Sequence, residues 1–114
     1  MTIKTFEDIV AWRKSKDLCI EIYRIFRSCK DYSFRDQIFR AAISVMNNIA
    51  EGYERNGNKE FRNFLFIAKG SCGELRSMLH IALELKYITR GQYDKLLQES
   101  ITISKMLSGL IKAL

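Results

Sequence analysis

Hydrophobic residues recur three and four positions apart along almost the whole chain, which is the spacing of one face of an α-helix. The pattern predicts four helices, at about residues 7–28, 34–54, 59–86 and 90–113. The third is the most regular, with apolar positions that alternate four and three residues apart: Phe61, Leu65, Ala68, Cys72, Leu75, Leu79 and Ala82. Such spacing favours helices that pack with nearly aligned axes.

Polar residues predict where three of these helices begin. A hydroxyl residue followed three positions later by an acid or amide can bind free backbone amides of a first turn. The chain has this spacing at Thr5-x-x-Asp8, Ser33-x-x-Asp36 and Thr89-x-x-Gln92. We therefore expect these pairs to open the first, second and fourth helices.

Glycines divide the pattern further. Gly52 and the run Asn56-Gly57-Asn58 predict the end of the second helix, because Gly and Asn tolerate the left-handed backbone conformation. Gly70 and Gly73 fall inside the third helix, where each costs about 1 kcal/mol relative to Ala. We expect another backbone to come close at these two positions.

The connections between the predicted helices are short, so helices that follow one another should run antiparallel. The expected fold is all-α, an antiparallel up-down-up-down four-helix bundle that forms one domain over residues 1–114. Its 114 residues include no Pro, which permits long uninterrupted helices. A second apolar line on three of the helices exceeds what one bundle core requires, and it predicts an oligomer interface.

A line of polar residues interrupts the apolar pattern of the second helix, and two polar positions of the third can meet it. These residues are Arg40, Ser44, Asn47, Asn48, Glu51, Ser71 and Glu74. We interpret them as a polar network that fixes helix register and assembly, a known use of polar residues at packed positions. A substrate site, with Glu51 as acid or base and Arg40 binding an anion, is the alternative.

The net charge of +6 makes nucleic acid a candidate partner, although Lys and Arg are scattered among 13 acids and also fit a solvated surface. The cations expected near helix ends and aromatic residues are Arg13, Lys14, Arg55, Lys59, Arg62 and Lys69. Nearby, Tyr53, Phe61 and Phe66 could stack on bases, and Phe66 lies farthest from the apolar lines. A scaffold that binds a protein partner is the alternative function.

Other chemistry finds little support in the sequence. The cysteines Cys19, Cys29 and Cys72 form no CxxC pair, and His80 is the only histidine, so we expect no metal and no cofactor. A catalytic triad would depend on that one histidine, and we expect no enzyme. No apolar run approaches the ~20 residues that span a bilayer and no leader is evident, which places the chain in the cytoplasm.

Several segments together resemble the four-helix-bundle proteins encoded within intervening sequences of bacterial 23S ribosomal RNA genes. The most specific are Asn48-Ile-Ala-Glu-Gly-Tyr and, in the third helix, Ile67-Ala-x-Gly-Ser-x-x-Glu-Leu75. The others are Phe6-Glu-Asp, Val10-x-Trp12-x-Lys14, Gln37-x-x-Arg40-Ala-Ala, Lys59-Glu-Phe and Lys86-Tyr-Ile. The resemblance runs from end to end of the chain.

The resemblance implies a left-handed antiparallel bundle that assembles into a ring, a homopentamer, with no established enzymatic activity. The family is similar in shape and basicity to nucleic-acid-binding accessory proteins of diversity-generating retroelements, an analogy that favours a polyanion partner. The chain departs from the family at Met46-Asn47, where a Pro is usual, so a kink expected there is absent or milder. We therefore expect a non-enzymatic, basic, homo-oligomeric bundle that binds RNA or DNA.

Overall fold

The structure is a computed structural model in which residues 2–114 are described. Within these residues the chain forms a short 3-10 helix, η1 (Phe6–Asp8), and four α-helices: α1 (Val10–Phe26), α2 (Tyr32–Glu54), α3 (Asn58–Glu84) and α4 (Arg90–Ala113). The described residues contain no β-strand. The all-α class and the four helices expected from the apolar spacing are confirmed.

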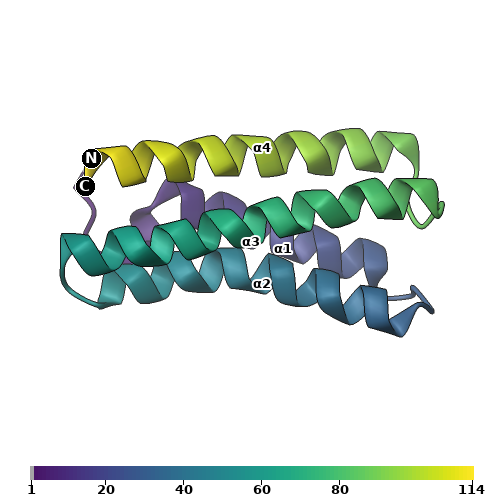
Figure 1. The fold of residues 1–114 in the computed structure, drawn as a ribbon, viewed down its shortest axis with the longest axis horizontal. Coiled ribbons are helices and arrows are strands. Elements are labelled where there is room, and N and C mark those ends of the chain that lie inside the picture. Colours follow the sequence, from purple (N-terminus) through teal and green to yellow (C-terminus); the bar gives the residue numbers. More distant parts are fainter. Residues whose placement is uncertain (1) are drawn as a thin grey trace.

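The four α-helices lie side by side along a molecule of 42 × 22 × 19 Å (Figure 1). Each of α1 and α3 contacts both α2 and α4, and the α1–α4 seam is the sparsest of the four. Both chain ends and the α2–α3 connection lie at one end of the molecule, here called the terminal end (Figure 1). The α1–α2 and α3–α4 connections lie at the opposite end.

The core receives one column of apolar side chains from each helix. The heptad predicted for α3 supplies its column, and all of its members except the half-buried Phe61 are fully buried. The largest fully buried side chains of the other helices are Leu18, Ile22, Phe26, Ile38, Val45, Ile49, Leu96, Ile103 and Leu107. Burial of each such side chain contributes roughly 1.5–3 kcal/mol, so this column determines which face of each helix points inward.

The first helix differs from its prediction, because residues 6–8 form η1 and α1 begins only at Val10. The Asp8 carboxylate accepts hydrogen bonds from the backbone amides of Lys4 (2.9 Å) and Thr5 (3.2 Å). The Thr5/Asp8 pair therefore caps η1. Between η1 and α1, Ile9 adopts an extended conformation and buries its side chain in the core. Burial of Ile9 gives a physical reason for the interruption.

The second helix begins at Tyr32, and its cap is Asp31, so the prediction that Ser33 opens it was wrong. One carboxylate oxygen of Asp31 accepts from the Phe34 amide at 3.2 Å, and the other accepts from the Tyr87 hydroxyl at 2.6 Å. Ser33 lies exposed in the first turn. Because Tyr87 belongs to the α3–α4 connection, the Asp31 side chain caps α2 and also joins the two connections at that end.

The other helix boundaries follow the predicted chemistry. Thr89 Oγ1 accepts from the Gln92 amide at 3.1 Å and Gln92 Oε1 accepts from the Thr89 amide at 2.9 Å, so the capping box of α4 is confirmed. Asn56 has a positive φ of 57° in the α2–α3 connection. Lys86 follows α3 with a φ of 61°. Both residues adopt the left-handed conformation that allows the chain to leave a helix.

The close approach between backbones lies at Gly52, whereas we expected it at Gly70 and Gly73. A Cβ added to Gly52 would lie 2.6 Å from the Cβ of Phe64 on α3. At Gly70 and Gly73 an added Cβ would meet no heavy atom within 4 Å. Within the described chain no backbone comes close to these two glycines, because they lie outside the buried column of α3. Their outer positions leave them free to face another molecule.

Candidate functional site

Three residues of the predicted polar line meet at the seam between α2 and α3. The hydroxyl oxygens of Ser44 and Ser71 lie 2.7 Å apart. Asn48 Nδ2 donates to the Ser44 carbonyl oxygen at 2.8 Å and to its hydroxyl oxygen at 2.9 Å. All three side chains are half-buried. The Ser44–Ser71 contact joins α2 to α3 at this point, and the Asn48 contacts lie within α2.

The remaining members of the predicted line are exposed on the outer side of this seam: Arg40, Asn47, Glu51 and Glu74. Arg40 Nη2 donates to Gln37 Oε1 at 3.2 Å, one turn earlier on α2. The carboxylate of Glu51 pairs with Arg55 at 2.7 Å. A groove of about 510 Å³ includes Arg40 but not Glu51 in its lining. The structure therefore does not bring Arg40 and Glu51 into one pocket.

Exposed apolar residues of α3 border the same seam. Ile67, Ile81 and Leu85 are 51%, 48% and 52% exposed. The second apolar lines of the other helices are largely covered by the bundle itself; Phe26 and Leu96, for example, are buried. Exposed apolar surface remains on α3 and also on α1, where Val10, Ile20 and Tyr23 are 45%, 41% and 36% exposed. We define the α2–α3 face as the surface of Ser44, Asn48, Ile67, Ser71, Ile81 and Leu85.

A second surface lies on the opposite side of α3, toward α4. An open groove of about 340 Å³ runs between the two helices and is lined by Phe66, Lys69, Ser108, Gly109, Ile111 and Lys112. Lys69 lies seven residues from Arg62 and from Arg76, and Lys105 lies seven from Lys112. Residues seven apart follow one line along a helix. We define the α3–α4 face as Phe66, Lys69, Arg76, Lys105 and Lys112.

None of the four cations of the α3–α4 face forms an ion pair within residues 2–114. Ion pairs involve Lys16, Arg35, Arg55, Arg90 and Lys95, and most other Lys and Arg side chains of these residues are unpaired as well. The α3–α4 face is therefore distinguished by the alignment of its cations beside one groove. Sequence reasoning selected Lys69 but missed Arg76, Lys105 and Lys112. The seven-residue spacing was the signal that could have identified them, combined with the adjacency of α3 and α4 that only the fold supplies.

The six cations predicted to bind nucleic acid do not form one surface. Arg13 and Lys14 lie on α1, which is diagonal to α3. Arg13 Nη1 donates to the Glu7 carbonyl oxygen at 2.8 Å. Lys14 borders a small cavity of about 200 Å³ together with Glu99 of α4. Both α1 cations are therefore separated from those on α3.

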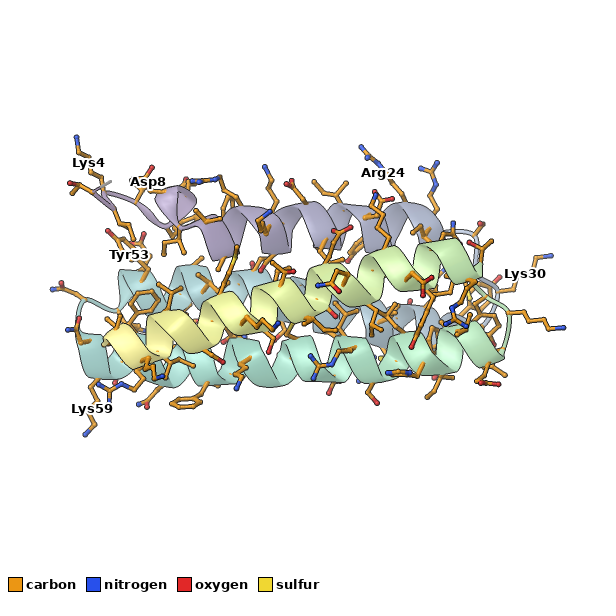
Figure 2. The ribbon with its side chains drawn as sticks, turned by 90° about the horizontal axis from the view of Figure 1, so that it is seen from above. Lys4, Asp8, Arg24, Lys30, Tyr53 and Lys59 are labelled. Atoms are coloured by element: carbon orange, nitrogen blue, oxygen red, sulfur yellow. The ribbon has the colours of Figure 1, made fainter. Side chains whose placement is uncertain are left out.

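The other four predicted cations follow the α2–α3 connection and α3. Lys59 is exposed at the terminal end, the same end as Lys4, whereas Arg24 and Lys30 lie toward the opposite end (Figure 2). Arg55 lies over the Phe64 ring, 5.0 Å from its centroid. Arg62 Nη2 donates to the Leu114 backbone oxygen at 2.6 Å. Of these four cations only Lys69 lines the α3–α4 groove, and within residues 2–114 its side chain forms no hydrogen bond or ion pair.

The described residues contain no evident reactive centre. Burial raises the pKa of the Cys72 thiol to about 11, and its sulfur donates to the Ser100 carbonyl oxygen at 3.2 Å. His80 is exposed, with its Nδ1 3.0 Å from the Tyr93 hydroxyl. No group of three His, Cys, Asp or Glu side chains in residues 2–114 could hold a metal ion. Across the same residues, no helix has the length and apolar character to span a bilayer.

Comparisons with known proteins agree with the fold. The model of the 23S rRNA-intervening sequence protein family matches residues 7–109. The structure is similar to that of a protein of unknown function from the S23 ribosomal protein family of Bacteroides thetaiotaomicron, with a TM-score of 0.84 and 30% identity, covering 90% of this chain and 99% of that one. A search of curated proteins found no match. The chain belongs to the 23S rRNA-intervening sequence protein family.

Proposed function

We propose that this protein is a non-enzymatic, homo-oligomeric four-helix bundle with up-down-up-down connectivity that binds RNA or DNA electrostatically. The observation that carries the binding is the α3–α4 face, where four cations of adjacent helices, none in an ion pair within residues 2–114, line or continue one groove. Such cations release counterions from phosphates on binding. The net charge of +6 acts in the same direction over long range.

Connectivity and assembly rest on separate observations. The placement of successive connections at opposite ends of the molecule supports the up-down-up-down order (Figure 1). The α2–α3 face supports self-association, because Ile67, Ile81 and Leu85 leave about half of their surface in water. Covering that surface with another copy would contribute about 25 cal/mol for each Å² of apolar area removed from water. A ring, the homopentamer that the family resemblance implies, forms if this face meets a different surface of the next copy.

The absence of enzymatic activity is also part of the proposal. It is supported by the separation of Arg40 from Glu51, whose carboxylate is bound by Arg55. It is further supported by Cys72, a thiol whose raised pKa keeps it protonated near neutral pH. Both features fit side chains that stabilise the bundle.

A salt titration tests the nucleic-acid function. Binding of a labelled duplex and of a labelled single strand is followed by fluorescence anisotropy as the salt concentration rises. If Z phosphates are neutralised, the logarithm of the affinity should fall with a slope of about −0.9Z on duplex DNA. Absence of binding to either probe at low salt contradicts the proposal.

A scaffold that binds a protein partner is the second candidate. It is favoured by an apolar groove of about 510 Å³ at the α1–α4 seam, lined mainly by Ile3, Ile9, Val10, Ala11, Met106 and Leu110. Val10 is 45% exposed there, so a charge at this position can be tolerated by the fold. A partner that co-purifies after nuclease treatment and is lost in Val10→Asp would favour this function over nucleic-acid binding.

A further inference from the structure

We infer that the groove between α3 and α4 binds single-stranded nucleic acid, with Phe66 stacked on an unpaired base and Lys69 and Lys112 bound to neighbouring phosphates. The inference rests on the nucleic-acid function proposed above, and it assigns that function to one face and to one class of nucleic acid.

The Phe66 ring is free to stack. Its side chain is 54% exposed, and within residues 2–114 it takes part in no aromatic pair and no cation–π contact. Other aromatic residues that sequence reasoning considered are engaged, since Tyr53 and Phe61 pack edge to face at 5.9 Å. An exposed ring bordered by cations is the combination that single-strand-binding proteins use.

The groove leaves room beside that ring. Its lining on the α4 side includes Ser108 and Gly109, both small residues. A Cβ added to Gly109 would meet no heavy atom within 4 Å, so no other part of the described chain fills the space above it. A flat base can therefore approach α4 while it lies against Phe66.

Cations stand on both helices along the groove. Lys69 on α3 and Lys112 on α4 line it directly. Arg76 and Lys105 continue the two lines seven residues away, which is roughly 10 Å along each helix axis. Successive phosphates of a flexible single strand can contact these two rows of cations. Contacts with Lys69 and Lys112 then hold the nucleic-acid backbone close enough for a base to reach Phe66.

The aromatic ring discriminates between single and double strands. In a duplex every base is already stacked between its neighbours, and a protein must unstack it at a cost of a few kcal/mol before using its face. An unpaired base presents that face freely. Cations alone would bind either form, so the exposed ring is what selects the single strand.

The test uses the full-length chain and fluorescence anisotropy with three probes: a mixed-sequence single-stranded RNA, the single-stranded DNA of the same sequence, and the DNA duplex. We expect either single strand to bind more tightly than the duplex, and the tighter of the two identifies the natural class. Phe66→Leu keeps the apolar volume but removes the ring, and it should weaken single-strand binding by at least about fivefold. Duplex binding should change by less than about twofold.

The lysines are tested by charge removal with a matched control. Lys69→Gln/Lys112→Gln should make the slope of log affinity against log salt shallower by about 1.4 on a single strand, because each lost phosphate contact removes about 0.7. Lys30→Gln/Lys86→Gln removes the same charge at the opposite end of the bundle and should leave the slope nearly unchanged. Circular dichroism and light scattering verify that all variants retain the fold and the mass of the parent protein.

The outcomes separate this inference from the function on which it rests. Failure of the parent protein to bind any probe at low salt contradicts both. Binding with equal or greater affinity for the duplex, or an unchanged affinity in Phe66→Leu, overturns the inference while leaving electrostatic binding intact. Equal slopes for the two lysine pairs would place the phosphate contacts elsewhere and also overturn it.

Discussion

The two sides of α3 carry different chemistry. Toward α2, Ser71 is hydrogen-bonded to Ser44 and bordered by exposed aliphatic residues such as Ile67. Toward α4, the exposed residue is aromatic, Phe66, and its neighbour Lys69 has no carboxylate partner. Phe66 and Ile67 are adjacent in sequence but point about 100° apart around the helix. One helix thus presents a face suited to another copy and a face suited to a polyanion.

This separation is what the proposed self-association of a basic protein requires. Like charges placed opposite one another in an interface cost several kcal/mol, so an assembly surface benefits from few cations. The α2–α3 face consists of hydroxyl, amide and aliphatic groups, with Arg40 and Glu74 beside it in the same groove. The four cations of the α3–α4 face lie on the other side of α3. Substitutions that affect one face should therefore leave the other unchanged.

Adjacent substitutions give the strongest test of the comparison. Ile67→Asp should dissociate the oligomer, because a carboxylate buried without a partner costs several kcal/mol. Phe66→Asp should leave the oligomer intact. Light scattering measures the outcome, with 13.3 kDa expected for a dissociated chain. A parent protein of that mass, or dissociation by Phe66→Asp alone, would contradict the assignment of the α2–α3 face to assembly.

The inner contact between α2 and α3 gives the next largest effect. Gly52→Ala should lower the free energy of unfolding by about 2 kcal/mol, since the new methyl group would press on Phe64 and force the helices apart. Gly70→Ala adds the same methyl group in open space and should raise stability by up to about 1 kcal/mol through helix propensity. Urea unfolding of both variants provides the comparison. An equal change in the unfolding free energy of the two variants would show that the close packing of Gly52 against Phe64 does not exclude a methyl group.

The polar bridge should contribute a smaller amount. Ser44→Ala, Ser71→Ala and the double variant form a cycle whose coupling free energy should be about 0.5–1.5 kcal/mol. Ser108→Ala on the α3–α4 side, where no such bridge exists, should change stability by less than about 0.5 kcal/mol. Urea unfolding measures each value. A coupling near zero would mean that the two hydroxyls are bound independently.

The smallest expected effect concerns the contact between Asp31 and Tyr87. It joins the α1–α2 connection to the α3–α4 connection, at the end of the bundle opposite the terminal end. The hydrogen bond that the Tyr87 hydroxyl donates to the Asp31 carboxylate raises the pKa of Tyr87 to about 12 and lowers the pKa of Asp31. Stabilisation from Tyr87 is therefore full below its unfolded pKa of about 10 and declines as pH rises toward 12. Stabilisation from Asp31 is full above its ordinary pKa of 3.8 and declines as pH falls below it.

Tyr87→Phe isolates this contribution. Between neutral pH and about pH 11 the parent protein should lose more stability than the variant, because only the parent has this hydroxyl to ionise. Urea unfolding at the two pH values gives the difference. The same loss in both proteins would show that the contact between Asp31 and Tyr87 does not contribute in solution.

The sequence predicted the parts of the fold that depend on spacing alone. The column of α3 from Leu65 to Ala82 is buried because positions alternating four and three apart share one face whatever the neighbouring helix. The capping box at Thr89 was equally local. The cap of α2 was missed although its contact is local, since Asp31 is a favoured cap residue that accepts from the Phe34 amide three positions on. The contact of Asp31 with Tyr87, 56 residues away, is the part that no local pattern reveals.

The candidate surfaces were less predictable for the same reason. The polar spacing placed Ser71 near the α2 line, but it did not show which apolar residues the bundle would cover. That outcome depends on how far neighbouring helices extend, and it left Ile67 exposed while burying Phe26. The grouping of Lys69 with Lys112 likewise requires α3 and α4 to be adjacent. Long-range adjacency, not side-chain type, was the missing information.

The sparse α1–α4 seam determines where thermal motion should first open the molecule. α1 is the shortest of the four α-helices, with 17 residues, and an apolar groove of about 510 Å³ lies between its start and α4. Few contacts must break for α1 to swing away, whereas α2 and α3 interlock along their length. Backbone amides of α1 should thus exchange with deuterium through local opening, and those of α2 and α3 only when the whole protein unfolds.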